Sequence, residues 1–454
     1  MPLKIRFLIH YALLALYLLM LCLFTSSSAF AAVCGAWQPA SLPTSPQQWQ
    51  IEYKRLYPLF TACLSSADFL AYYGAIQLRT GQVNDALDTL ERALLLNPNH
   101  GAAQMDYAQA LFYNGDPFAA QSLNQHLLSN QNLPPVIRQQ IQANQAKLKG
   151  LLNTFSHQFN VSSGYDTNLN TSPNISQLTL TLDGEEWLLA LADGMESRSG
   201  GVVRLGATSR YTQRGANTNQ SVQLGINSRL SENSDDQQHQ LTARYQHQYA
   251  LLNGGDLKHD VALIGLQHGH KPIFATVEVR QEWQAASKAN TLAGACQFNP
   301  QHTLGYQDFL SRDYLNALEY RLMPALHCGF AALNNADLRL SAGVLFNYAL
   351  DEARAGGNRL GQEVTAHWQQ PLPIGRLSLQ ARYSRWQDAQ GYSGTLQNNA
   401  RRDVKRYQAT VAYLVPLTHN LLLSTQVAVQ QQTSNLELFE YKSRQIELGI
   451  NWQF

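Results

Sequence analysis

The fold of most of this chain is decided by its last ten residues, Gln445-Ile446-Glu447-Leu448-Gly449-Ile450-Asn451-Trp452-Gln453-Phe454. Apolar residues alternate with polar residues or glycine along the whole stretch. A strict period of two indicates a β-strand with one apolar and one polar face. In a transmembrane barrel the apolar face meets lipid and the polar face lines the lumen. The stretch therefore predicts the last strand of a membrane-spanning β-barrel.

This terminal strand also carries a candidate signal for membrane assembly. The residues Glu447, Gly449, Trp452 and Phe454 resemble, in order and spacing, the terminal signal by which the outer-membrane assembly machinery recognises its barrel substrates. An exposed edge strand that ends on an aromatic residue is available for strand pairing with a partner. We therefore expect the barrel assembly machinery to be a partner of this chain.

The same alternation extends backwards to residue 153. It predicts fourteen strands, which begin near residues 155, 200, 219, 238, 257, 271, 296, 313, 337, 360, 375, 404, 418 and 440. Short turns at Gln213–Asn219 and Pro371–Gly375 fall at one end, and long loops at Tyr165–Gly200 and Gln390–Arg402 fall at the other. Outer-membrane barrels have short periplasmic turns and longer external loops. An open sandwich or a soluble barrel is the alternative, and either requires an apolar face turned inward.

Composition fits this prediction. The 454 residues carry a net charge of +1, only 14% are charged and 10% are aromatic, with 21 tyrosines. A nucleic-acid binder has a basic excess, so nucleic acid is not an expected partner. An ordinary soluble domain has about 25% charged residues. Few charges and many tyrosines suit strands that face lipid on one side and a wet lumen on the other.

A different periodicity precedes the barrel. Residues 67–98 match the 34-residue tetratricopeptide pattern, with Gly74 at a helix crossing and Gly81 near the turn, and Ala108 and Gly115 repeat these positions. We therefore predict an α+β multidomain chain: tetratricopeptide-like helices over residues 32–152, then a 14-stranded antiparallel transmembrane β-barrel over 153–454. Repeats of this kind form a concave groove that holds a peptide or partner. We expect Tyr73, Gln77, Tyr107 and Leu111 to line such a groove. A rigid stalk or plug is the alternative.

The first 31 residues predict a secretory signal peptide. Lys4 and Arg6 precede an apolar run from Phe7 to Phe24, and Ala29-Phe30-Ala31 supplies a cleavage site. An uncleaved membrane anchor is the alternative, because the run is long enough to span a bilayer.

Four cysteines follow the predicted cleavage site, and an even number in an exported chain favours disulfides. Of the three possible pairings we favour Cys34–Cys63 and Cys296–Cys328, because each pair lies within one domain.

Motifs for catalysis and metal binding are weak. The run Asp166-Thr167-Asn168-Leu169-Asn170 has the spacing of a calcium loop's first ligands, but the following glycine and the distal glutamate are missing. No phosphate-binding loop, nucleophile elbow or zinc-protease motif is present. We therefore expect no metal, no cofactor and no enzymatic activity. A hydrolase assembled from scattered Ser, His and Asp residues is the open alternative.

With these parts in this order, the chain resembles the surface lipoprotein assembly modifiers (Slam), including the hemophilin secretion modulators. Two stretches carry the resemblance, Ala103–Gly115 followed by Leu133–Pro135, and Phe159–Asn170 at the start of the barrel. The resemblance implies periplasmic tetratricopeptide repeats and a fourteen-stranded barrel in outer-membrane lipid. It also implies that the chain helps particular lipoproteins or secreted haem-binding proteins, the client proteins, to reach the cell surface or the medium.

Under this resemblance the repeat groove presents an unfolded or chaperone-held client to the lumen, so periplasmic chaperones are expected partners. Three rival functions stay open. A polysaccharide exporter also couples repeats to a barrel, usually with a far longer repeat array. A simple porin could carry the helices as an appendage, and a passive scaffold would transport nothing.

Overall fold

A computed structural model describes residues 34, 37, 43–129, 133–192, 194–252, 254–285, 289–291 and 294–454. The predicted signal peptide, residues 1–31, lies outside the described residues. The chain divides into two compact units, and the boundary falls between Leu152 and Asn153. Among the described residues no helix combines the length and the apolar character needed to cross a membrane.

The first unit is helical. Its six described α-helices are α3 (Pro46–Leu56), α4 (Ala67–Arg79), α5 (Val83–Leu96), α6 (Gly101–Tyr113), α7 (Pro117–Ser129) and α8 (Pro135–Leu152), with short 3₁₀ turns at Tyr57–Leu59 and Thr61–Cys63. Side-chain caps help to define where the helices begin: Ser45 forms a capping box with Gln48 at α3, and the Ser66 hydroxyl accepts the Phe69 N–H at α4.

Close approach between helices explains the small residues. A Cβ on Gly74 of α4 would lie 2.6 Å from Leu90 Cγ of α5, so only glycine fits at this crossing. Gly81 and Gly115 follow α4 and α6 with the same positive φ of 86°, a conformation that favours glycine. Equivalent turns therefore join α4 to α5 and α6 to α7. The assignment of the two helix pairs to the tetratricopeptide class stays a prediction.

Aromatic side chains form the core of the helical unit where α3 packs on α4. Tyr73 of α4 stacks on Phe69 at 5.8 Å and on Tyr53 of α3 at 5.7 Å between ring centroids. A disulfide joins Cys34 to Cys63, the pairing favoured from the sequence, beside this cluster. The helix α3 and the turns that follow it therefore pack on α4 and cover one of its faces.

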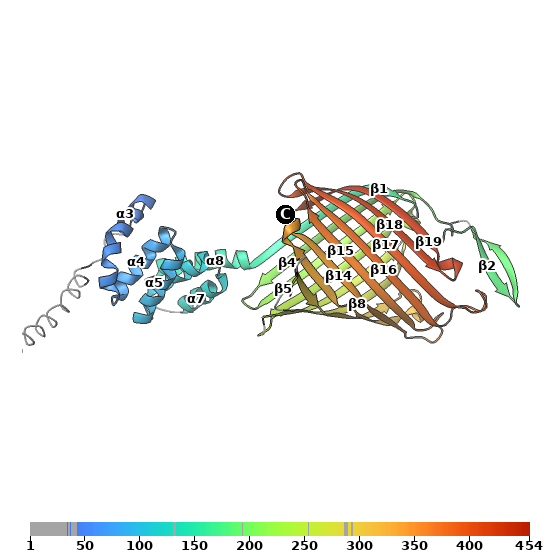
Figure 1. Ribbon diagram of the computed structural model, residues 1–454, viewed down its shortest axis with the longest axis horizontal. Coiled ribbons are helices and arrows are strands. Elements are labelled where there is room, and N and C mark those ends of the chain that lie inside the picture. The colour runs from blue at the N-terminus through green and yellow to red at the C-terminus, as the bar shows by residue number, and fades with distance from the viewer. Residues whose placement is uncertain are drawn as a thin grey trace, which may run out of the picture. The chain divides into compact units, whose positions relative to one another are not determined.

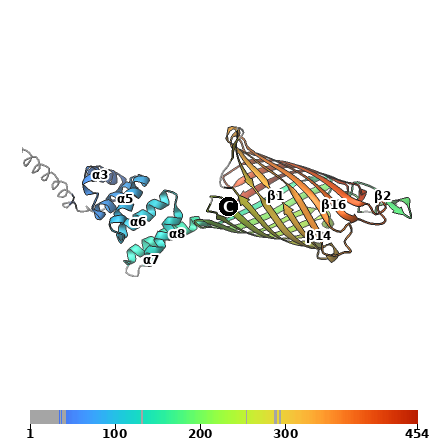
Figure 2. The same ribbon diagram turned by 60° about the horizontal axis from the view of Figure 1, so that its bottom comes forward.

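The second unit is a closed barrel of fourteen antiparallel strands, in which β1 pairs with both β4 and β19 (Figures 1 and 2). Twelve strands are unbroken: β1 (Asn153–Asp166), β4 (Gly200–Arg214), β5 (Thr218–Ser231), β6 (Gln238–Ala250), β7 (Asp256–His268), β8 (Lys271–Gln284), β14 (Ala336–Ala349), β15 (Arg359–Pro371), β16 (Arg376–Gly391), β17 (Arg401–Pro416), β18 (Leu421–Ser434) and β19 (Tyr441–Gln453). The prediction of a fourteen-stranded antiparallel barrel after a helical region is confirmed.

The seventh and eighth strands are each broken by a proline. The seventh consists of β10 (Gly294–Asn299) and β11 (Gln301–Asp308), and the eighth of β12 (Ala317–Leu322) and β13 (Ala325–Phe330). Their register places Pro300 opposite Pro324. Proline has no N–H to donate, so the hydrogen-bond ladder is interrupted at the same level in both strands. A short β9 (Ala289–Thr291) pairs with β10, and a disulfide joins Cys296 to Cys328, again as favoured from the sequence.

The two ends of the barrel differ. At the turn end lie the start of β1, the C-terminus and short connections such as 215–217 and 417–420. At the loop end lies the connection 167–199, which contains the hairpin β2 (Gln177–Leu182) and β3 (Glu185–Ala190) (Figure 1). Outward positions are mainly apolar, as in β5 with Val222, Leu224 and Ile226 exposed. Leu345 breaks the inward polar pattern and is buried in the lumen.

The closing seam between β1 and β19 is tight. A Cβ on Gly164 of β1 would lie 2.0 Å from the Ile446 carbonyl oxygen, and one on Gly449 of β19 would lie 2.7 Å from the Val161 carbonyl oxygen. At the turn end the Phe454 and His157 backbones exchange hydrogen bonds of 2.7 and 3.0 Å. Glycines at the seam therefore let the first and last strands approach closely.

We predict that Gly164→Ala destabilises the barrel. The added methyl group has to displace backbone at the seam, and overpacking of this kind typically costs about 1–3 kcal/mol. The free energy of unfolding in guanidinium, measured on the refolded barrel in lipid, is expected to fall by that amount.

Gly265→Ala is the matched control, because a Cβ on this strand glycine meets no atom within 4 Å. It is expected to change stability by less than about 0.5 kcal/mol, as surface substitutions usually do. Equal effects of the two substitutions would contradict a tight seam.

Candidate functional site: the lumen and its loop-end polar network

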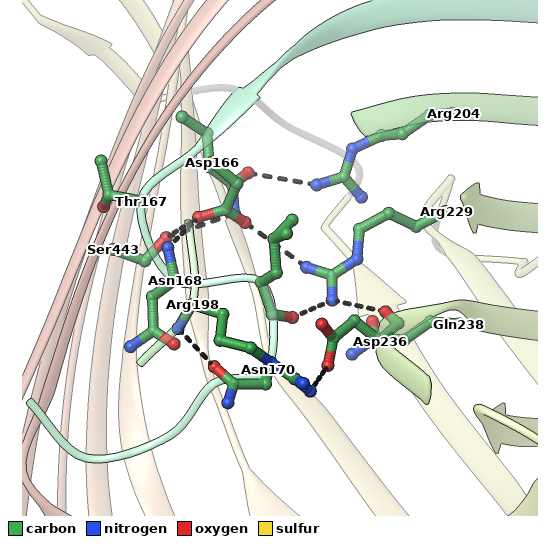
Figure 3. Close-up of polar contacts among 12 residues, drawn as sticks. Asp166, Thr167, Asn168, Asn170, Arg198, Arg204, Arg229, Asp236, Gln238 and Ser443 are labelled. Atoms are coloured by element: carbon green, nitrogen blue, oxygen red, sulfur yellow. Dashed lines mark hydrogen bonds and ion pairs between the residues drawn. The ribbon is translucent and has the colours of Figure 1, made fainter. Parts of the chain in front are cut away.

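A buried carboxylate marks the point where β1 leaves the barrel wall. Asp166 is fully buried, and its Oδ1 accepts hydrogen bonds from the Asn168 backbone N–H at 2.8 Å and the Ser443 hydroxyl at 2.9 Å (Figure 3). Its Oδ2 accepts the Gln445 amide at 2.8 Å and lies 3.4 Å from Nη1 of Arg229. A buried charge needs partners of this kind to offset its desolvation.

The network continues into the loops. Arg229 of β5 donates from Nη2 to the carbonyl oxygens of Leu169 and, at 3.2 Å, of Asp236. The Asp236 carboxylate in turn pairs with Arg198 at 2.5 Å (Figure 3). We call Asp166, Asn168, Arg198, Arg229, Asp236, Ser443 and Gln445 the Asp166 network.

This network holds both limbs of the long loop. Besides the Arg229 contact to Leu169, the Leu169 N–H donates to the Arg198 carbonyl at 2.6 Å, and the Arg198 N–H donates to Asn170 Oδ1 at 3.0 Å. The segments before and after the β2–β3 hairpin are thereby joined at the lumen's loop end. The calcium-like spacing at Asp166–Asn170 thus serves polar contacts within the protein. No group of three or more metal-ligating side chains occurs among the described residues.

The predicted assembly-signal residues lie along the seam. Glu447 faces the lumen, where it accepts from Arg204 of β4 at 2.6 Å and from the Ser162 hydroxyl at 2.9 Å. Trp452 and Phe454 are exposed on the outward face, and their ring centroids are 4.7 Å apart. Glu447 thus ties β19 to β1 and β4 across the seam. Recognition of these residues by the assembly machinery stays a prediction.

Ion pairs line the rest of the lumen. Carboxylates that are buried or half-buried lie beside half-exposed arginines. Neighbouring strands supply the pairs Arg244–Asp260 (3.6 Å), Arg382–Glu363 (2.7 Å) and Arg359–Asp388 (3.3 Å), and strands further apart supply Arg321–Glu278 (3.8 Å) and Arg339–Glu282 (3.6 Å). Arg402 shares Asp388 at 3.1 Å. Since each of these arginines has an acidic neighbour, the bore is polar with both signs of charge interspersed.

Two cavities open among these lumenal side chains. One of about 310 Å³ is lined by Arg280, Arg321, Arg339, His367 and Arg382, and another of about 230 Å³ by Gln380, Gln408, Ser443 and Gln445. Guanidinium, carboxylate and amide groups donate and accept hydrogen bonds. The bore can therefore satisfy the backbone or side-chain groups of a polar solute.

The groove predicted in the helical unit needs correction. Tyr73 and Gln77 are only 2% and 5% exposed, and Tyr73 packs against Tyr53 of α3 and against Phe60 in the segment that follows α3. Tyr107 and Leu111 of α6 are half-buried. Neither Tyr73 nor Gln77 lines an open groove, so that part of the prediction is wrong. The sequence predicts a helix before the repeats but does not show which face it covers.

A small depression of the helical unit lies among α6, α7 and α8. It measures about 120 Å³ and is lined by Phe112 and Tyr113 of α6, Asn124 of α7, and Asn144 and Lys147 of α8. Tyr113 is exposed, whereas Asn124 is buried. The depression therefore lies among α6, α7 and α8, away from the buried residues Tyr73 and Gln77 of α4.

The sequence does not reveal the Asp166 network. Its partners Arg229, Asp236 and Ser443 come from three other elements, up to 277 residues away from Asp166. Alternation places Arg229 and Ser443 on inward faces, which reduces the number of residues that could be partners of Asp166. Pairing them requires the strand order and register, which alternation alone does not supply.

No protein-family model matches the chain, and no curated protein matches its sequence. Solved structures show general likenesses. The type III secretion translocator chaperone SycD of Yersinia enterocolitica matches 23% of this chain and 73% of its own, at 16% identity and a TM-score of 0.21. An anion-selective porin from Comamonas acidovorans matches 66% and 99%, at 8% identity and 0.34. A bacterial polysaccharide outer-membrane secretin matches 66% and 98%, at 5% identity and 0.35.

The architecture itself defines the class of protein. A closed antiparallel barrel with an apolar outer face and a polar, ion-paired bore is an outer-membrane β-barrel, and this class includes translocators and porins. The protein is thus an outer-membrane barrel with a helical unit at its N-terminal side in the sequence.

We predict that Asp166→Asn releases the long loop. The substitution leaves the buried Arg229 without its counter-charge, and breaking a buried pair in this way costs about 3–5 kcal/mol. Limited proteolysis of the folded barrel is expected to cleave within residues 167–199 much faster than in the wild type, and single-channel conductance is expected to rise.

Two further variants make the test specific. Glu352→Gln removes an exposed carboxylate from another loop and is expected to leave proteolysis and conductance unchanged. The double variant Asp166→Asn/Arg229→Gln restores charge balance, so its loss of stability is expected to be smaller than the sum of the single losses. Strict additivity would contradict direct coupling of the two residues.

The helical unit also provides a pH test. Burial raises the pKa of Asp106 on α6 above its usual range, and the guanidinium of Arg79 at 3.1 Å offsets only part of this effect. The folded state therefore binds this proton more tightly than the unfolded state. The free energy of unfolding falls as the pH rises from the ordinary carboxyl range through the raised pKa of Asp106. Asp106→Asn is expected to remove that slope. Thermal unfolding followed by helical circular dichroism between pH 4 and 7 measures it, with the exposed Asp88→Asn as a control that keeps the wild-type profile.

Proposed function

We propose that this protein is an outer-membrane translocator of the surface lipoprotein assembly modifier type, which helps particular lipoproteins or secreted haem-binding proteins to reach the cell surface or medium. In this proposal the helical unit and the turn end face the periplasm, and the loop end faces outside. Short turns at the end where β1 starts, with the long loop at the other, support this orientation.

One observation carries the proposal: a single chain combines a helical unit with a closed, polar-lined barrel, and no residue separates them. The helix α8 ends at Leu152 and β1 begins at Asn153. A general diffusion pore needs only the barrel. A directly joined helical unit with its own surface depression supports a further step, the binding of a protein client before passage.

The lumen supports the passage step. A polypeptide cannot cross hydrocarbon with its backbone groups unsatisfied, since each such group costs several kcal/mol. Arginine, carboxylate and glutamine side chains along the bore offer replacement hydrogen bonds at successive levels, from Glu282 and Arg339 toward Glu319 and Asn347. The client is delivered by periplasmic chaperones, and its folding outside prevents its return. This scheme needs no nucleotide.

A comparison of whole-cell surface proteins tests this function. Cells with the wild-type gene, without it, and with a gene lacking codons 46–150 are treated with protease, and the released peptides are identified. We expect one or a few lipoproteins or haem-binding proteins to lose surface exposure without losing expression in both mutant strains, because the client is no longer presented.

The outcomes separate the rival functions. The double variant Tyr113→Ala/Lys147→Ala, at the depression of the helical unit, is the finer probe and is expected to reduce client display. Lys54→Ala/Tyr57→Ala, at the end of α3 and in the turn after it, is the matched control and is expected to leave client display unchanged. Full client display without residues 46–150 would refute presentation by the helical unit. Steady conductance in planar bilayers with no surface protein lost would favour a porin, and loss of a surface polysaccharide would favour an exporter.

A further inference from the structure

The outer wall of the barrel has a depression built from small side chains. The strand register places Ala366 of β15, Ala381 of β16 and Ala409 of β17 directly side by side on the outward face. Three adjacent methyl groups leave the wall thin at this level. The depression has a volume of about 560 Å³, and the alanines form its floor together with Val429 of β18.

Tyrosines follow on the loop side of this floor. In the next outward row of the same strands, Tyr383 lies opposite Tyr407, and their ring centroids are 5.1 Å apart. Aromatic residues concentrate where hydrocarbon gives way to head groups, since their rings suit both environments. The depression thus runs from an apolar floor toward the level of the membrane–water interface.

Basic side chains occupy the same edge. Lys442 and Arg444 of β19 are exposed and line the depression, and Lys405 of β17 is exposed one row beyond the tyrosines. Arg385, opposite Lys405, pairs with Asp403 at 2.6 Å. Within the described part of the chain, no carboxylate lies at ion-pair distance from Lys405, Lys442 or Arg444. Three outward cations therefore lack a salt bridge within the protein.

Cations without a salt bridge at this level are available to an anion of the membrane. A lysine or arginine on the lipid face is unfavourable in the hydrocarbon, and the cost falls toward zero at the interface. Anionic head groups attract basic residues there, by about 1 kcal/mol for each Lys or Arg. The three cations thus fit a lipid that brings negative charge to the same edge as the alanine floor.

We infer that this surface, defined by Ala366, Ala381, Ala409, Lys405, Lys442 and Arg444, binds one molecule of lipid A, the phosphorylated glycolipid of the outer leaflet. An acyl chain lies on the alanine floor and beside the tyrosines. The phosphate groups contact the three cations. The choice of leaflet rests on the orientation proposed above, in which the loop end faces outside.

A second hollow on the outer wall is larger but has no lysine or arginine in its lining. The outward face over β1 and β4–β8 has an apolar hollow of about 1000 Å³, which is larger than the alanine depression. No lysine or arginine is among its lining residues. Size alone therefore does not single out a lipid site, whereas a depression joined to cations without salt bridges has both parts that an anionic lipid recognises.

Lipid binding to the purified full chain in detergent tests the inference. Native mass spectrometry measures retention of added bisphosphorylated lipid A, phosphatidylglycerol and phosphatidylethanolamine. We expect one lipid A to bind more tightly than either phospholipid, and Lys442→Gln/Arg444→Gln to weaken it on the order of 30-fold. Ala381→Trp fills the floor, keeps every charge, and is expected to abolish the preference for lipid A.

Matched controls use the other surfaces. Ala243→Trp fills the uncharged hollow, and Arg214→Gln/Arg376→Gln removes two exposed cations at the turn end. Both are expected to retain wild-type lipid A binding.

Folding of every variant is checked by its heat-modified mobility on gels, and Lys442→Gln alone replaces the double variant if that fails to fold. Unchanged binding of lipid A by the cation variants would overturn the site, and tighter binding of phosphatidylglycerol than of lipid A would overturn the choice of lipid. Neither result depends on client transport.

Discussion

Backbone hydrogen bonding between β1 and β19 is the constraint on which the barrel depends. In hydrocarbon, an unpaired strand edge leaves N–H and C=O groups without partners at a cost of several kcal/mol each. The register from Gln158–Gln453 to Asp166–Gln445 closes the sheet and removes that edge. Closure joins strands that lie almost 300 residues apart in the chain, so the barrel cannot close before the last strand, β19, pairs with β1. The glycines at the seam are a direct consequence, because side chains there would hold the strands apart.

Closure also divides the side chains into two chemical sets. Once the sheet is a cylinder, inward residues have no lipid to meet and outward residues have no water except at the rims. Inward charges therefore pair with each other, as Arg204 pairs with Glu447 and Arg382 with Glu363. Outward charges occur where β16, β17 and β19 reach the interface. Charges inside the lumen are paired, whereas at the outer interface cations without a salt bridge lie beside the Arg385–Asp403 pair, because water and head groups there lower the cost of an unpaired charge.

The sequence predicts those properties that depend on near neighbours in the chain. Alternation is a two-residue property, so it locates the strands to within a few residues, from the first at 153 to the last at 441. The strand-pair position of Cys296 and Cys328 follows from counting strands, because adjacent antiparallel strands must bring their ends together. The proline breaks at Pro300 and Pro324 show where this reasoning stops. A local pattern shows each proline, but only the register shows that they face each other.

The misplaced helical groove and the missed Asp166 network have the same cause. Repeat spacing places Tyr73 and Gln77 on one face of α4, but whether that face is open depends on the helices packed around it, such as α3 at Tyr73, and their packing is not encoded in the repeat spacing. The alternation along β1 predicts that Asp166 faces the lumen. The other members of its network come from β5, β19 and the η3 turn (Ser234–Asp236). Both features are contacts between elements distant in sequence, and single-sequence periodicity does not encode them.

The Asp166 network gives the long loop a different status from an ordinary surface connection. Asp166 belongs to β1 and Ser443 and Gln445 to β19, so the network straddles the closing seam at the loop end. The bonds that hold Leu169 and Arg198 in place therefore also hold the two seam strands together. Moving the base of this loop would break buried hydrogen bonds at the seam, whereas the hairpin beyond it has exposed residues along the whole of β3. The base of the loop is thus part of the barrel wall. Further contacts hold the loop beyond Asn170, where the Asn174 N–H donates to the Glu440 carbonyl at 3.3 Å and the Thr181 N–H donates to the Thr395 carbonyl at 2.9 Å.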